Sequence, residues 1–246
     1  MTKNNLKYIL FLAFFGLVGG YFTILYSIEL LTPEAIEEAI AQVGSIELVI
    51  LISTLQYLSY SVILGLIGRE ISRKIGLWRE FSLEAMPVVS TLFASLIGGG
   101  IFILADVFVF GRYIPAVLES YNAKPTLNYI IASITYGGVV EEVMIRLFLM
   151  SLIVLVLAKL SKGKTPIEAH FVVANIISAL LFAAGHLPAT MQSIGVSPII
   201  LIRCFVMNGA FGLLFGRMYR KYGIGYAMLT HAGVHIVSKL VWILFI

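Results

Sequence analysis

Residues 127–158 read LNYIIASITYGGVVEEVMIRLFLMSLIVLVLA, an apolar run in which only Glu141, Glu142 and Arg146 are charged. A continuous helix of this length would extend about 48 Å at 1.5 Å per residue, whereas the hydrocarbon core of a bilayer is about 30 Å thick. The segment is therefore long enough to cross a membrane. Its excess length predicts a tilt, a break near Gly137-Gly138, or an interfacial start.

The rest of the 246-residue chain repeats this apolar pattern. Hydrophobic residues make up 60% of it and charged residues 12%, whereas about a quarter of the residues of a soluble domain are charged. Further windows long enough to cross a bilayer lie at about 8–31, 46–68, 86–110, 171–190, 197–216 and 224–246. We predict an all-α, polytopic membrane protein with seven or eight transmembrane helices, in which residues 1–246 form a single membrane domain.

Basic residues report the orientation of the chain, because cytoplasmic loops are enriched in Lys and Arg. Alternate connections hold twelve of them, and the opposite connections hold only Arg112 and Lys124. We therefore expect a cytoplasmic N-terminus and a C-terminus outside. The net charge of +4 is explained by this topology, so we expect the lipid bilayer, and no nucleic acid, as a partner. The twelve are Lys3, Lys7, Arg69, Arg73, Lys74, Arg79, Lys159, Lys162, Lys164, Arg217, Arg220 and Lys221.

Two connections have the pattern of amphipathic helices. Thr32 followed by Pro33 and Glu34 is a typical helix start, with a capping hydroxyl and proline in the first turn. Basic and apolar residues alternate from Arg69 to Glu84, which predicts an interfacial helix on an anionic leaflet. The single cysteine, Cys204, lies in an apolar stretch and is interpreted as a packing residue.

Ionisable residues inside the spans are the candidates for function, because each costs at least about 2.5–3.5 kcal/mol near the centre of a membrane helix. Glu142 and Arg146 are four apart and share a helical face, so they can neutralise each other, whereas Glu141 points elsewhere. A buried ion network that joins helices is the structural alternative, and Arg203 would join it or bind a substrate carboxylate. Asp106 is interpreted as a solvated or capping residue at the outer end of its span. Lys239 is expected to pair.

Histidines occupy two of the later spans. His186 follows the small residues 183–185, which allow close helix packing, and His231 and His235 are four apart on one face of the last span. A carboxylate and an imidazole in a low-dielectric site can hold and deprotonate a water molecule, and neighbouring imidazoles can donate hydrogen bonds to an oxyanion. Glutamate and histidine side chains are also zinc ligands.

At these residues the sequence resembles the CPBP family, also called ABI, which includes the type II CAAX prenyl proteases. Two glutamates, three residues and an arginine correspond to Glu141, Glu142 and Arg146; phenylalanine, three residues and histidine correspond to Phe182 and His186. The third motif, histidine with asparagine or another residue four positions later, corresponds to His231 and His235. The resemblance covers about residues 127–240, which would form the catalytic core.

The resemblance implies an intramembrane endopeptidase that hydrolyses a peptide bond of a lipidated, CAAX-like or membrane-proximal protein. Glu141 and His186 would activate the water, His231 and His235 would stabilise the oxyanion, and Glu142 and Arg146 would support them. No cofactor is required by this assignment. The prenyl proteases usually carry asparagine at the position of His235, and the histidine opens a zinc alternative with ligands Glu141, His186, His231 and His235.

Two other functions fit parts of the pattern. A non-catalytic member of the family, such as a bacteriocin-immunity or scaffolding protein, would keep the fold without the chemistry. A proton-coupled transporter would use the same carboxylates and histidines as a relay, although the chain shows no repeated halves of the kind found in many transporters. Replacement of Glu141 without loss of the biological effect would favour the non-catalytic protein.

Overall fold

The computed structural model describes residues 3–161 and 165–246, and throughout these ranges every regular element is a helix. Seven helical segments are long and apolar enough to cross a membrane, which confirms the predicted fold class with the lower of the two counts. They are Asn5–Glu29, Ile46–Lys74, Ala85–Arg112, Leu127–Leu160, Glu168–Ile194, Pro198–Tyr222 and Ile224–Phe245.

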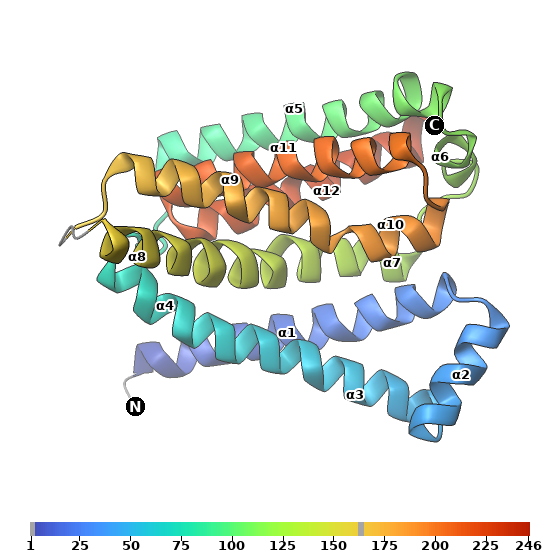
Figure 1. Cartoon of the computed structure of the whole chain (residues 1–246), viewed down its shortest axis with the longest axis horizontal. Coiled ribbons are helices and arrows are strands. Elements are labelled where there is room, and N and C mark those ends of the chain that lie inside the picture. Colours follow the sequence, from blue (N-terminus) through green and yellow to red (C-terminus); the bar gives the residue numbers. More distant parts are fainter. Residues whose placement is uncertain (1–2, 162–164) are drawn as a thin grey trace.

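Figure 1 shows the helices nearly side by side, with the two termini at opposite ends of the bundle. The last helix, α12, packs against α5 and η3, and α11 packs against α9. Helices α1, α3 and α4 form a hairpin that leans on η3 and is closed at its far end by α2 (Figure 1). The elements are α1 (Lys3–Glu29), α2 (Pro33–Val43), α3 (Ile46–Ser59), η1 (Tyr60–Leu64), α4 (Gly65–Lys74), α5 (Ala85–Phe108), η2 (Phe110–Arg112), α6 (Pro115–Ser120), α7 (Leu127–Ala132), η3 (Ser133–Met150), α8 (Ser151–Leu160), α9 (Glu168–Gly185), α10 (Leu187–Ile194), α11 (Pro198–Tyr222) and α12 (Ile224–Phe245).

The fourth span is helical without a break from Leu127 to Leu160, so the interruption expected as one option near Gly137-Gly138 is absent. Its middle part, η3, is instead wound as a π-helix, in which each turn closes on the residue five positions along. The glycines serve close packing: a Cβ on Gly138 would lie 2.7 Å from the Cβ of Ala232 in α12. The π-helical turns and the close approach of Gly138 to Ala232 together determine which residues of η3 face α12.

The two predicted amphipathic connections had different outcomes. The helix start at Thr32 is confirmed, since its side-chain oxygen accepts a hydrogen bond from the backbone N–H of Ala35 at 3.3 Å. The interfacial helix from Arg69 to Glu84 is wrong beyond Lys74. There Gly76 has φ +75°, and the N–H of Leu77 donates to the carbonyl of Ser72, so the helix ends in a glycine cap. Leu77 is then buried in the core, which a surface helix would not allow.

Candidate active site

Glu142, Arg146 and His231 form a buried charged cluster between η3 and α12. Oε1 of Glu142 lies 3.1 Å from Nη1 of Arg146 and 2.9 Å from Nδ1 of His231. The Glu142 and Arg146 side chains are fully buried, and His231 is 3% exposed. Because a carboxylate paired with Arg146 only accepts hydrogen bonds, Nδ1 of His231 is the donor. One carboxylate oxygen therefore ties the last span to the fourth.

Aromatic rings enclose this cluster. The guanidinium of Arg146 lies 4.4 Å from the ring centroid of Phe182 and 5.5 Å from that of Phe215, and its Nη2 donates to the carbonyl of Gly212 at 3.1 Å. The His231 ring stacks on Phe215 with the centroids 4.1 Å apart. The rings exclude water and lipid, which strengthens the charge pair. The sequence motifs gave no sign of Phe215 or Gly212.

His186 lies where α9 meets α10. This one residue separates the two helices while keeping helical backbone angles, and Pro188, which has no N–H to donate, lies in the first turn of α10. Nδ1 lies 2.8 Å from the carbonyl oxygen of Phe182, and since a carbonyl only accepts, Nδ1 carries the proton. In the neutral form of the ring, Nε2 would then have a free lone pair. The imidazole has the tautomer of a proton acceptor.

Glu141 and His235 converge above Gly137. A Cβ built on Gly137 would lie 3.1 Å from Nε2 of His235 and 3.9 Å from Oε2 of Glu141. Both polar atoms therefore face the same small space, which exists because residue 137 has no side chain. The His235 ring also stacks on the His231 ring, with the centroids 4.9 Å apart. The space above Gly137 therefore lies next to the buried cluster.

The predicted residues thus fall into three groups in space. Glu142, Arg146 and His231 are in direct contact, Glu141 and His235 share the space above Gly137, and His186 packs its ring on Phe182 at 4.5 Å between centroids. No hydrogen bond joins His186 to Glu141 among the described residues. Within residues 3–161 and 165–246, no three histidine, cysteine, aspartate or glutamate side chains are gathered as a metal site.

Asp106 differs from its sequence interpretation, because it is 1% exposed and bound on two sides. The guanidinium of Arg203 forms a bidentate ion pair with its carboxylate, and the hydroxyl of Tyr121 donates to Oδ2 at 2.9 Å. Burial, followed by the adjacent Asp106 carboxylate, raises the pKa of Tyr121, so its phenol stays a donor. Arg203 therefore joins Asp106 and not the Glu142 cluster. The pair links α5 to α11.

Two further residues named from the sequence pack in the interior. Cys204 is fully buried and its thiol donates to the carbonyl of Ala183 at 3.4 Å, as expected for a packing residue. Lys239 is 3% exposed, and its ammonium lies 4.2 Å from the ring centroid of Tyr129. Among the described residues, its partner is thus the face of an aromatic ring, which makes a cation–π contact. From the sequence we expect Lys239 to pair, and an ionic partner is one form of that expectation.

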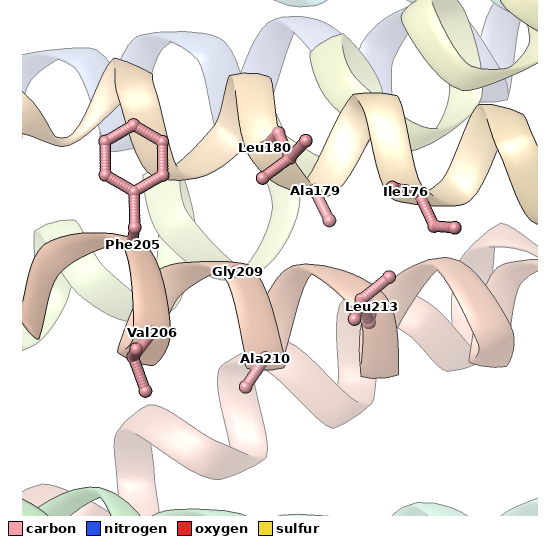
Figure 2. A pocket seen from close by; sticks show the side chains of 8 residues that line it. All are labelled: Ile176, Ala179, Leu180, Phe205, Val206, Gly209, Ala210 and Leu213. Carbon is pink, nitrogen blue, oxygen red and sulfur yellow. The ribbon is translucent and has the colours of Figure 1, made fainter. Parts of the chain in front are cut away.

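The membrane-facing surface carries two apolar grooves that contain none of these residues. One, of about 280 Å³, lies between α9 and α11, and Figure 2 shows aliphatic side chains of both helices around Gly209. The other, of about 610 Å³, lies between α5 and α11. Their linings hold no acid, base or hydrogen-bonding side chain, so neither groove is the candidate site. The lining of the first is Ile176, Ala179, Leu180, Phe205, Val206, Gly209, Ala210 and Leu213.

The fold and the cluster together define a class: a polytopic helical membrane protein with carboxylates, histidines and an arginine gathered inside its bundle. Residues 122–237 match the family model described as type II CAAX prenyl endopeptidase Rce1-like. This segment is just under half of the chain and contains all three motifs, and the match confirms the resemblance to the CPBP family of CAAX-type proteases noted from the sequence. No curated protein and no solved structure matches the chain.

Proposed function

We propose that the protein is an intramembrane endopeptidase that hydrolyses a peptide bond of a lipidated, CAAX-like or membrane-proximal protein, with Glu141 as the general base. The observation that carries the proposal is the convergence of the Glu141 carboxylate and the His235 imidazole on one space above Gly137. A reacting carbonyl needs this combination, a proton acceptor on one side and a hydrogen-bond donor close by.

Water is the nucleophile in this mechanism. Glu141 takes a proton from the water, whose oxygen attacks the carbonyl carbon of the scissile peptide, and the C–O bond forms as the carbonyl π electrons move to oxygen. His235 donates a hydrogen bond to that oxyanion from Nε2. When the tetrahedral intermediate collapses, the C–N bond breaks and the proton passes from Glu141 to the leaving amine. The free Nε2 of His186 accepts a hydrogen bond from the water before attack.

The buried cluster has a supporting role in this assignment. Glu142 holds His231 through Nδ1 and is itself neutralised by Arg146. His231 then stacks on His235, so Glu142 and Arg146 fix the pair of imidazoles without touching the substrate themselves. We assign His231 as the second oxyanion donor, which requires its imidazolium form because Nδ1 is already engaged with Glu142.

The reaction is tested by cleavage of a quenched fluorescent lipidated peptide by the purified protein. Glu141→Gln and His186→Ala should each lower kcat/KM by at least about 100-fold, since a positioned base contributes about 10²–10⁴. Glu37→Gln, an exposed glutamate in α2, is the matched control and should retain the rate. Full activity in both site variants would refute the assignment.

The same assay distinguishes metal-free hydrolysis from zinc-dependent hydrolysis. We propose a water activated without a metal, so a chelator should leave the rate unchanged. Loss of activity with chelator, with recovery on adding zinc, would make Glu141, His186, His231 and His235 zinc ligands instead. A folded wild-type protein that cleaves no lipidated or membrane-proximal peptide would favour a non-catalytic family member.

A further inference from the structure

Two tyrosines from different halves of the chain meet beside the candidate site. Tyr57 of α3 and Tyr136 of η3 pack edge to face, with ring centroids 4.9 Å apart and planes at 69°. Both side chains are partly exposed, and among the described residues neither phenol has a hydrogen-bond partner. Neither phenolic oxygen is fully buried, so both hydroxyls are free to donate a hydrogen bond to an external partner.

The N-terminal helix is shaped to hold this pair. Gly19 and Gly20 lie side by side in α1, where a Cβ on Gly20 would lie 2.7 Å from the Cβ of Tyr57. A Cβ on Gly19 would lie 2.9 Å from the backbone nitrogen of Tyr136. Two adjacent glycines thus let α1 approach both tyrosines at once. Such specific packing is expected where small residues permit close contact between membrane helices.

The tyrosine pair faces Glu141. Because one turn of the π-helix closes on the fifth residue, Tyr136 lies one turn from Glu141 on a shared side of η3. Tyr136 also precedes Gly137, which borders the space shared by Glu141 and His235, and Tyr57 packs on the Tyr136 ring. His235 of α12 is the ionisable group that shares the space above Gly137 with this carboxylate. The two hydroxyls are therefore the neutral donors on the α3 side of the site.

We propose that Tyr57 is a substrate-binding residue, whose phenol donates a hydrogen bond to a main-chain carbonyl oxygen of the peptide that lies over Glu141, with Tyr136 as its support. This inference rests on the proposed function and deepens it. The helix that supplies Tyr57 lies outside residues 122–237, the segment that matches the family model. The N-terminal hairpin is therefore one wall of the substrate site.

Binding is measured without catalysis by titrating a fluorescent lipidated peptide into the Glu141→Gln protein in detergent. Adding Tyr57→Phe should raise Kd about three- to tenfold, the effect of losing one hydrogen bond while the ring is kept. Tyr113→Phe is the control, because that tyrosine is 69% exposed and distant in sequence from the site. A Kd within twofold of the parent, or a parent protein that binds none of the peptides, would overturn the inference.

Steady-state kinetics of the otherwise wild-type protein provide a second readout. Tyr57→Phe should raise KM by a similar factor, with a larger effect on KM than on kcat. Gly20→Ala, which displaces Tyr57 through α1, should also raise KM. A fall in kcat at constant KM would instead locate the phenol at the attacking water and refute substrate binding. If the wild type binds the peptide but does not cleave it, the proposed function fails while the Kd comparison still decides the role of Tyr57.

Discussion

At the scale of single residues, the guanidinium of Arg146 shows how one side chain supports several elements. It pairs with Glu142 in its own helix, donates to Gly212 in α11 and lies over Phe182 of α9. Its charge is fully buried, so its loss would leave the Glu142 carboxylate without a compensating cation. Removing one partner of a buried ion pair costs about 3–5 kcal/mol.

We therefore predict that Arg146→Met lowers the free energy of unfolding by about 3–5 kcal/mol. Denaturant unfolding in detergent, followed by circular dichroism, measures this loss. Arg73→Met is the matched control: Arg73 also pairs with a glutamate of its own helix, at 3.6 Å from Glu70, but both side chains are about half exposed or more. Its loss should be below about 1 kcal/mol, as for surface pairs. Equal losses would contradict the charge network.

Gly137 gives a second prediction at this scale. Gly137→Ala introduces a methyl group 3.1 Å from Nε2 of His235 and 3.9 Å from Oε2 of Glu141, in the space assigned to water and substrate. Peptide cleavage should fall by at least about tenfold, since misplacement of about 1 Å can cost about 10² in rate. The protein should remain folded by circular dichroism.

Gly100→Ala is its control, because nothing lies within 4 Å of a Cβ at that position and alanine favours helix by about 1 kcal/mol. It should keep full activity. If both alanine variants cleave the peptide at the wild-type rate, the space above Gly137 is not the reaction site.

Sequence reasoning at this scale succeeded within helices and failed between them. The pairing of Glu142 with Arg146 follows from four-residue spacing, and the structure contains it. The contact of Glu142 with His231 spans 89 positions in sequence, and no local pattern encodes which neighbouring helix faces it. For the same reason Asp106 was interpreted as solvated, whereas Arg203 neutralises it from α11.

At the scale of elements, the ion pair of Asp106 and Arg203 joins α5 to α11, and Tyr121, the residue after α6, donates a hydrogen bond to Asp106. We predict that Asp106→Asn and Arg203→Met each destabilise the fold by several kcal/mol, about 3–5 by analogy with other buried pairs. The double variant should lose less than the sum of the two, because neither charge is then left alone. Thermal unfolding of the wild type, the two single variants and the double variant in detergent measures these losses.

Strict additivity of the two losses would contradict an energetic coupling between these helices. Lys159→Met serves as the comparison, since it removes a basic residue from the last turn of α8 that no ion pair within the described residues involves. That variant should leave the unfolding temperature nearly unchanged, in line with a surface substitution.

The π winding of η3 is an element-scale feature that the sequence did not predict. With α-helical turns, Glu142 and Arg146 share a face but Tyr136 and Glu141 do not, since five residues are well over one turn at 3.6 residues each. The wider turns bring Tyr136 and Glu141 together. Helix starts were easier to predict from the sequence, because a capping residue such as Thr32 binds a backbone N–H in the first turn of its own helix.

At the scale of the whole molecule, length and hydropathy sufficed to locate every span. The way the spans pack was not predictable, because the lipid-facing side of a membrane helix is as apolar as its packed side. In α5, for example, Leu92, Phe93 and Leu96 are more than half exposed, while Ile103 is 2% exposed. No periodic pattern distinguishes the two faces, so hydropathy gives the spans without their neighbours.

The orientation of the bundle is the last prediction. Seven spans would place the termini on opposite sides of the membrane, and we expect the basic ends of α4 and α11 to face the cytoplasm. Cysteine labelling tests this directly, because the native Cys204 is fully buried and should give little background. Glu37→Cys in α2 should react with a membrane-impermeant maleimide in intact cells, and Lys221→Cys at the end of α11 only after permeabilisation. Wild type carrying Cys204 alone is the control.

The reverse labelling pattern would invert the topology and move the N-terminus outside. Labelling of both positions in intact cells would contradict a sealed seven-span bundle.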